Sequence, residues 1–105
     1  MSALIRIVKM EFRPAEIERF LAIFAERRER IRAFPGCTHL ALWRDQQNGH
    51  VFFTYSHWES AAALEAYRQS VFFKSTWALT KPLFAARAAA WSVAAVPFPR
   101  PDISG

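Results

Sequence analysis

The segment FFTYSHWES, residues 52–60, combines aromatic rings, hydroxyl groups and an imidazole in one short run. His57 could take a proton from a bound molecule near neutral pH, and the indole of Trp58 beside it could stack on a flat ligand. The hydroxyl groups of the segment could orient a polar atom of the same ligand. The alternative is that the rings only fill a core, because aromatic side chains dominate the buried area of small proteins.

Strand geometry limits how these residues can act together. Adjacent residues of a regular strand point to opposite faces of a sheet, so His57 and Trp58 would line one pocket only if a bulge intervened. If Trp58 faces helices, His57 faces a partner subunit or solvent. His39, alone on the preceding strand, and His50, beside a turn, are weaker candidates for a catalytic base. Alternation places three more side chains on the face of Trp58: Phe52, Thr54 and Ser56.

Length and composition predict one small globular domain. The chain has 105 residues, of which 52% are hydrophobic and 22% charged, which allows one core but not two. We expect the domain to cover residues 1–96 and a proline-rich tail, extended or disordered, to cover residues 97–105. No apolar stretch approaches the roughly 20 residues that cross a bilayer, so we expect no membrane partner. The start shows no secretory signal, and a cytoplasmic location is expected.

The formal net charge of +5 permits an anionic partner. Much of the charge lies in ERFLAIFAERRERIR, where Glu26 precedes Arg30 by four residues and can pair with it on a solvated helix face. The run NGHVFFTY partly imitates the strand signature of RNA-recognition domains. That signature requires a basic residue at the position of Asn48 and an aromatic residue at that of His50, so nucleic acid is not favoured as a partner.

The cysteine and histidine content argues against a metal centre. Three dispersed His and one Cys show no spacing typical of metal ligands, so no metal is expected. Cys37 cannot form an internal disulfide. It also has no basic neighbour in the sequence that would lower its pKa, and we expect an inert thiol.

Hydrophobic periodicity predicts the order strand, helix, strand, strand, helical region, strand. Ser60 and Ser70 can cap two helices of the later helical region, and the Asn48-Gly49 pair is expected to supply the positive φ angles of a tight hairpin turn. This order specifies an α+β, ferredoxin-like split βαβ fold with a four-stranded antiparallel sheet. The expected strands cover residues 3–12, 37–45, 50–58 and 88–96, and the expected helices cover residues 14–33, 61–69 and 71–80.

One face of such a sheet is left without helices. Val51, Phe53 and Tyr55 point to one side of their strand while other aromatic residues point to the opposite side, so neither side suits water. A large exposed apolar face is typical of an interface. We therefore expect a homodimer in which two sheet faces meet.

The run FFTYSHWESAAALEAYRQSVFFKSTWALTKPLFA, with FPGC before the second strand and AWSV in the last, resembles the antibiotic biosynthesis monooxygenase family. The likeness covers residues 4–96. Its most specific part is the aromatic and polar run that ends in Trp-Glu-Ser. The resemblance implies a dimeric α/β barrel built from ferredoxin-like subunits. Known members oxidise phenolic polyketides or quinols, or degrade haem.

The resemblance also implies a site. Polyketide-oxidising members carry Asn-Tyr-x-x-Trp-Glu-Ser, and the matching run here has Thr54 in place of Asn. The implied activity is cofactor-independent oxygenation of a phenolic or quinol-like small molecule in a pocket between sheet and helices. The catalytic candidates are Trp58, Thr54 and His57. The implied substrate-binding residues are Phe52, Ser56, Tyr67, Phe73 and Trp77.

Two alternatives follow from residues that differ from the family pattern. Haem-degrading members carry a Trp on the second helix and an iron-ligating His ten residues later, and these positions match Tyr67 and Trp77 here. Without an imidazole at that place the axial ligation fails, so haem is not expected, nor any other cofactor. The missing Asn keeps open a non-catalytic dimer of the same fold that binds or senses a small ligand.

Overall fold

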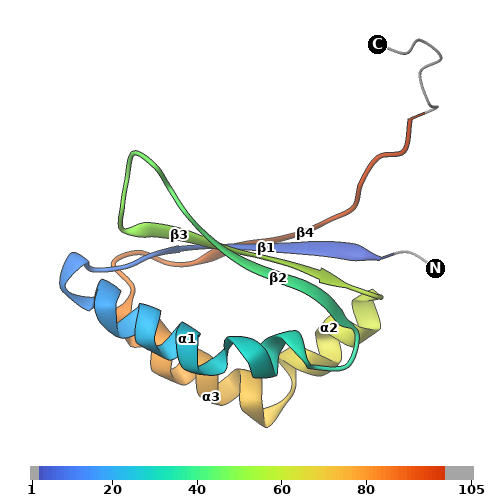
Figure 1. The fold of residues 1–105 in the computed structure, drawn as a ribbon, viewed down its shortest axis with the longest axis horizontal. Helices are drawn as coiled ribbons and strands as arrows, with labels where there is room; N and C mark the ends of the chain where they lie inside the picture. The colour runs from blue at the N-terminus through green and yellow to red at the C-terminus, as the bar shows by residue number, and fades with distance from the viewer. Residues whose placement is uncertain (1–2, 99–105) are drawn as a thin grey trace.

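The structure is a computed structural model that describes residues 3–98, in which one antiparallel sheet is covered on one face by helices (Figure 1). The predicted ferredoxin-like fold is confirmed: the strand order is β2-β3-β1-β4, with all pairs antiparallel. The strands are β1 (Leu4–Glu11), β2 (Cys37–Arg44), β3 (Val51–Trp58) and β4 (Ala89–Val93). The helices are α1 (Ile17–Arg32), α2 (Ala61–Arg68) and α3 (Val71–Thr80), with 3₁₀ turns at Pro14–Glu16 and Lys81–Leu83.

The serines predicted as helix caps occupy those positions. The Ser60 hydroxyl accepts a hydrogen bond from the Ala63 backbone N–H, and the Ser70 hydroxyl accepts one from that of Phe73. Each cap satisfies an N–H group that has no partner inside its helix. These caps fix where α2 and α3 begin, and α3 ends two residues before Pro82.

The predicted hairpin turn was wrong in its geometry. Positive φ occurs at neither Asn48 nor Gly49, and Gly36 is the one residue of the described chain that has it, at 90°. The loop is instead organised by the Asp45 carboxylate, whose Oδ1 accepts from the backbone N–H groups of Gln47 at 2.8 Å and Asn48 at 3.1 Å. A side-chain acceptor of this kind replaces the tight turn, because it holds the longer loop without left-handed residues.

Gly36 lets β2 begin against α2. A Cβ atom at this position would lie 2.4 Å from the Cβ of Ala63, and the Gly36 carbonyl accepts a hydrogen bond from the Glu59 N–H at 2.8 Å. Only glycine combines the left-handed backbone with this close approach. The segment FPGC therefore sets the distance between the sheet and α2.

Buried side chains form two clusters at opposite ends of the helical layer. The first, the hairpin-end cluster, contains Met10, Phe12, Phe20, Phe52 and Leu83. The second, the α2-end cluster, contains Ile31, Cys37, Trp58, Leu64 and Tyr67. The core is thus divided, and the space between the clusters is bounded by the sheet above and the helices below.

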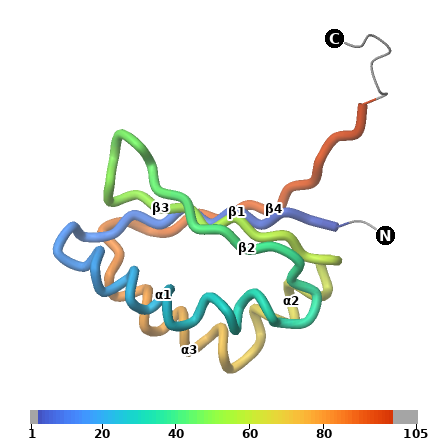
Figure 2. The backbone as a smooth tube through the Cα atoms, viewed as in Figure 1, coloured from blue at the N-terminus to red at the C-terminus, as the bar shows by residue number. Residues whose placement is uncertain are grey.

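Two further expectations require correction. Glu26 does not pair with Arg30: its carboxylate lies 3.9 Å from Nε of Arg27, while the Arg30 guanidinium lies 4.2 Å from the centre of the Phe72 ring. Arg30 gains more from an aromatic surface on α3 than from an exposed carboxylate. The last strand ends at Val93 instead of residue 96, and the chain then leaves the sheet (Figure 2).

The ends of the chain and its helices complete the outline of the domain. Of the proline-rich tail predicted for residues 97–105, residues 99–105 lie outside the described part, as do residues 1 and 2 at the start of the predicted domain. None of the helices within residues 3–98 has the length and apolar character needed to cross a lipid bilayer.

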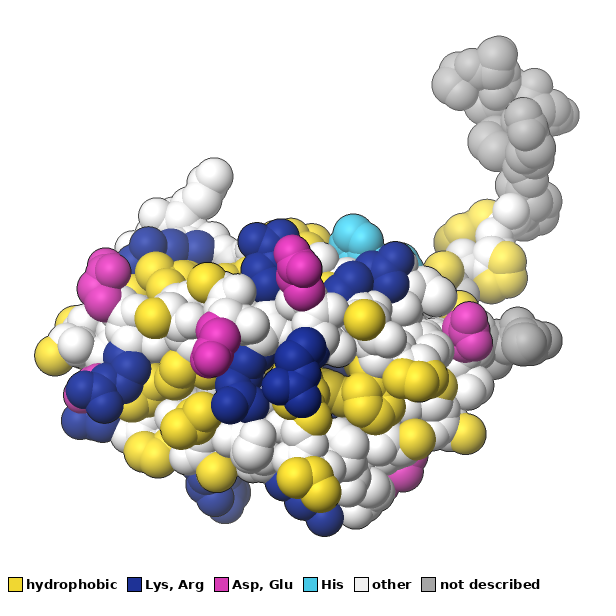
Figure 3. All heavy atoms as spheres, turned by 60° about the horizontal axis from the view of Figure 1, so that its bottom comes forward, with side chains coloured by type: hydrophobic (Ala, Val, Ile, Leu, Met, Phe, Trp, Pro, Cys, Tyr) yellow, Lys and Arg dark blue, Asp and Glu magenta, His cyan; other side chains and the backbone are white. Residues whose placement is uncertain are grey.

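Basic side chains do not gather in one stripe on the helical side of the molecule. The space-filling view of that side shows Lys and Arg spread among acidic and apolar side chains (Figure 3). Several arginines also have local partners: Arg19 with Glu16, and Arg68 with Glu65. This face therefore does not offer the continuous basic track that nucleic-acid backbones need.

Candidate functional site

A cavity of about 420 Å³ lies between the sheet and the helices, where the two core clusters leave space. Its walls come from the sheet above, chiefly from β1 and β3, and from all three helices below. Volumes of this size are typical of sites for small organic molecules. Aromatic and aliphatic side chains make up most of the wall, so the cavity is suited to a flat apolar guest.

Strand β3 supplies the upper wall through alternate residues. Thr54, Ser56 and Trp58 all line the cavity. Trp58 is only 1% exposed, and its indole Nε1–H donates a 3.0 Å hydrogen bond to the Ser56 hydroxyl oxygen. The bond fixes the indole plane and leaves the Ser56 proton available to a guest.

Helices α2 and α3 supply an aromatic lower wall. The Tyr67 ring stacks on Trp58 with 5.0 Å between ring centres, and Phe73 meets Tyr67 edge to face, also at 5.0 Å. Trp77 continues the series, parallel to Phe73 at 6.0 Å. Tyr67, Phe73 and Trp77 all line the cavity, so the structure brings these three predicted residues together with the β3 wall.

The Tyr67 phenol is held neutral. Burial raises its pKa well above that of an ordinary phenol, and the nearby Cys37 thiol acts in the same direction. Burial likewise raises the pKa of Cys37, against the opposing effects of a hydrogen bond with the His39 backbone and of the positive charge of Arg32. Tyr67 can therefore offer a hydrogen bond but does not act as an anionic base at neutral pH.

Two predicted residues lie elsewhere. Phe52 is 2% exposed and belongs to the hairpin-end cluster, where its ring lies 5.3 Å from that of Phe20, and it does not line the cavity. His57 points to the helix-free face of the sheet, as strand alternation requires, and its Nε2 lies 2.9 Å from the Tyr55 hydroxyl. In this subunit it cannot reach a guest on the other face.

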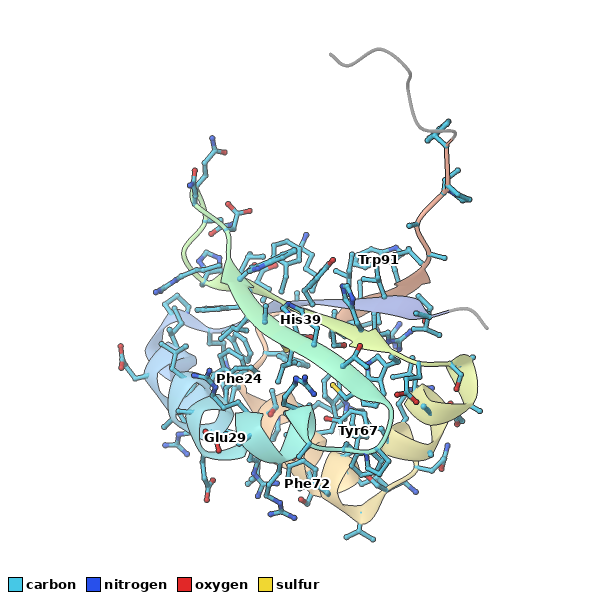
Figure 4. All side chains as sticks on the ribbon, turned by 45° about the vertical axis from the view of Figure 1, so that its right-hand side comes forward. Phe24, Glu29, His39, Tyr67, Phe72 and Trp91 are labelled. Carbon is cyan, nitrogen blue, oxygen red and sulfur yellow. The ribbon has the colours of Figure 1, made fainter. Side chains whose placement is uncertain are left out.

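The helix-free face carries a second group of rings. Tyr55 stacks on Trp43 at 4.4 Å and lies edge to face with His39 at 5.8 Å. Figure 4 shows Trp91 on this side of the sheet and Tyr67 on the helical side. Trp43 is 48% exposed and Trp91 47%, so a broad apolar surface faces away from the helices.

Three cavity-lining arginines were not predicted: Arg6 on β1, Arg27 on α1 and Arg68 on α2. The lining includes no Asp, Glu or His among the described residues, so its formal charge is positive. A signal for Arg6 existed in the sequence, because it alternates with Leu4 and Val8 on the helix-facing side of its strand. Charged residues are rarely buried without a partner, so an arginine on the helix-covered face of a strand indicates a polar site under the helices.

The cavity opens beside the edge strand β4. Ala90 pairs with Val8 and so faces the helices, yet it is exposed. Its methyl group covers little, and Ala88 next along the same face is equally small. The short side chains of β4 leave a mouth through which a guest can pass.

Comparison with known proteins identifies the family. The sequence profile described as antibiotic biosynthesis monooxygenase matches residues 3–78. The chain belongs to this family. A comparison with curated proteins gives no match.

Solved structures show that the whole fold of this family member is shared. An antibiotic biosynthesis monooxygenase is 24% identical, with a TM-score of 0.84 over 90% of this chain and 99% of the other. A conserved protein from Methanosarcina mazei Go1 is 16% identical, with a TM-score of 0.85 over 90% and 93%. Rv0793 from Mycobacterium tuberculosis is 20% identical, with a TM-score of 0.84 over 94% and 100%. At these identities the likeness establishes the fold.

Proposed function

We propose that this protein is a cofactor-independent monooxygenase that oxidises a phenolic or quinol-like small molecule in the cavity between sheet and helices. The observation that carries the proposal is the aromatic enclosure formed by Trp58, Tyr67 and Trp77, in a wall that also presents hydroxyl groups and positive charge. The family supports the same activity. The enclosure can bind a ring, and its largely apolar wall limits the access of water to a reactive anion.

The reaction balances without an added reductant. A phenol and O₂ give a quinone and water: a ring C–H and the phenolic C–OH both become C=O, one oxygen atom enters the product and the other leaves as water. The substrate supplies all the electrons. The chain therefore has to bind the phenol, favour its anion and orient it, and arginine charge near the ring lowers the cost of that anion.

Specific roles follow from position. Trp58 offers a fixed stacking surface, and Thr54 and Ser56 offer hydroxyl groups to a substrate oxygen. The cavity wall provides no carboxylate or imidazole base among the described residues, so the phenol loses its proton through its own acidity in a positive environment. His57 takes no part in this scheme within one subunit.

Oxygen uptake with a panel of quinols and hydroxynaphthalenes tests the activity. Replacing Thr54 by Val removes one hydroxyl and keeps the side-chain shape, and we expect turnover to fall about ten-fold, the value of one neutral hydrogen bond. Thr38→Val is the matched control, since Thr38 lies exposed on β2 outside the cavity. Equal activity in the Thr54→Val and Thr38→Val proteins would refute the role of Thr54.

A binding or sensing protein is the second candidate. The absence of Asp, Glu and His from the described lining favours it, because many enzymes place a base at such a site. Binding of a quinol to the cavity, seen as quenching of tryptophan fluorescence, without oxygen uptake across the panel would establish this alternative.

We also propose that the protein is a homodimer joined through the helix-free sheet face. Trp43, Trp91 and Val93 are each more than two-fifths exposed there, beside the half-buried Tyr55. Large apolar side chains gathered and exposed on one face are typical of an interface. Light scattering at micromolar concentration should give twice the chain mass, and a Trp91→Lys variant should give the mass of one chain. A wild-type monomer would contradict the interface.

A further inference from the structure

We infer that Arg6 is an anion-binding residue of the cavity, and that the guest is an aromatic molecule that carries a carboxylate in addition to its phenol. This inference deepens the proposed function and rests on it for the occupancy of the cavity. It depends on where Arg6 lies, on how the other charges near it are paired and on the mouth beside β4.

Arg6 lies in a polar row that crosses three strands. Its cross-strand partners are Ser56 on β3 and Ser92 on β4, which share its helix-facing side. Its guanidinium donates a 2.9 Å hydrogen bond from Nη1 to the Ser92 hydroxyl. Directly opposed side chains in a sheet lie close together, so the row presents a charged donor between two hydroxyl groups. This is a donor set suited to a carboxylate.

The charge of Arg6 has no close partner. Among residues 3–98, no carboxylate lies within 4.0 Å of its guanidinium. Burial lowers the pKa of Arg6, and the positive charge of Arg68 lowers it further, while Glu65 opposes this effect. A half-buried cation in such surroundings is stabilised by an anionic guest.

The other two cavity arginines are already engaged. Arg68 donates to the Glu65 carboxylate at 3.1 Å. Arg27 donates to the hydroxyls of Ser75 at 3.0 Å and Thr76 at 2.8 Å. Arg68 thus has its own counter-charge, and Arg27 ties α1 to α3. The Nε of Arg27 has no hydrogen-bond acceptor among the described residues, but the Glu26 carboxylate lies 3.9 Å from it. Arg6 is therefore the cavity arginine that has no carboxylate within 4.0 Å among residues 3–98.

The position of Arg6 sets the orientation of the guest. Arg6 lies directly opposite Ser56 on the neighbouring strand, and the Ser56 hydroxyl accepts the hydrogen bond from the indole of Trp58. A carboxylate on Arg6 therefore places the attached ring against the aromatic wall, with its phenol towards Thr54 in the next row of the sheet. The mouth beside Ala90 admits such a molecule past the edge strand.

A matched pair of ligands tests the inference. We would titrate the protein by calorimetry with 6-hydroxy-2-naphthoate, whose hydroxyl and carboxylate lie at opposite ends of the ring system, and with its methyl ester, which differs in one negative charge. The variants are Arg6→Gln, Arg6→Lys and the control Arg19→Gln, whose side chain on α1 is 70% exposed and lies outside the cavity. The wild type should bind the acid about ten-fold or more tightly than the ester at low salt, as for a charge-assisted bond.

The variants should separate charge from shape. Arg6→Gln should weaken acid binding about ten-fold and leave ester binding within about two-fold, which also shows that the variant is folded. Arg6→Lys should recover part of the loss, because it restores the charge without the planar donor fork. Arg19→Gln should bind both ligands as the wild type does. Higher salt should weaken the acid more than the ester.

Several outcomes would overturn the inference. It fails if acid and ester bind the wild type equally, if Arg6→Gln weakens both to the same extent, or if neither ligand binds. Oxygen uptake distinguishes this failure from that of the proposed function. Uptake with a neutral quinol and no preference for the acid refutes the inference alone, whereas an Arg6-dependent preference without uptake refutes the oxidation alone.

Discussion

Gly36→Ala should be among the most damaging single-methyl substitutions in this protein. The new Cβ would lie 2.4 Å from that of Ala63, on a residue whose φ is 90°. A left-handed backbone costs a non-glycine residue about 1–2 kcal/mol, and overpacking costs about 1–3 kcal/mol. We therefore expect a loss of about 2–5 kcal/mol in the free energy of unfolding.

Urea unfolding followed by circular dichroism measures this loss. At about 4–8 °C per kcal/mol for a domain of this size, the melting temperature should fall by about 10 °C or more. Gly49→Ala is the control, because its Cβ would meet only the Arg44 side chain at 3.7 Å and its φ is not positive. That variant should stay within about 0.5 kcal/mol of the wild type.

A second substitution separates strain from crowding. Ala63→Gly removes the methyl group that Gly36→Ala meets, at the cost of about 0.5–1 kcal/mol for a glycine in a helix. The double variant should recover the stability that Gly36→Ala loses to overpacking, because the methyl group it would meet is gone. The two changes should therefore be coupled by about 1–3 kcal/mol. Purely additive losses, or a Gly36→Ala protein as stable as the Gly49→Ala control, would refute the packing argument.

Three further predictions concern the cavity wall. Ser56→Ala should lower the free energy of unfolding by about 1–3 kcal/mol, because the buried indole N–H of Trp58 loses its acceptor; an unchanged urea midpoint would contradict this. Since burial raises the pKa of Tyr67, the folded state holds the phenolic proton more tightly than the unfolded state does, and the free energy of unfolding should fall as the pH rises above about 10. Urea titrations between about pH 9 and about pH 11 should show a smaller fall for Tyr67→Phe than for the wild type. Ala90→Leu should narrow the mouth and slow ligand association in stopped-flow fluorescence, with little change in melting temperature, and an unchanged rate would place the mouth elsewhere.

Much of the candidate site could be predicted from local pattern. Strand alternation placed Thr54, Ser56 and Trp58 on one face and His57 on the other, because the side-chain direction in a strand depends only on position along it. The caps at Ser60 and Ser70 were confirmed for a similar reason: each hydroxyl acts within three residues of itself.

The predictions that were wrong concern features that depend on contacts between residues far apart in the sequence or outside a regular element. Phe52 shares a face with Trp58 but lies in the hairpin-end cluster, because Phe12 and Phe20 close over it. The loop before β3 is held by Asp45 instead of by left-handed residues at Asn48-Gly49. Neither outcome is specified by the spacing of residues along one element.

The sequence by itself determined the order of the elements, their caps and the face to which each strand residue points, since these follow from periodicity and from bonds between near neighbours. Only the tertiary structure decided that the core divides into two clusters with a cavity between them. It also brought Arg6 to Ser92, 86 residues away, and left that arginine without a close carboxylate among residues 3–98. Such features depend on how side-chain volumes and charges from separate elements meet, which no local pattern contains.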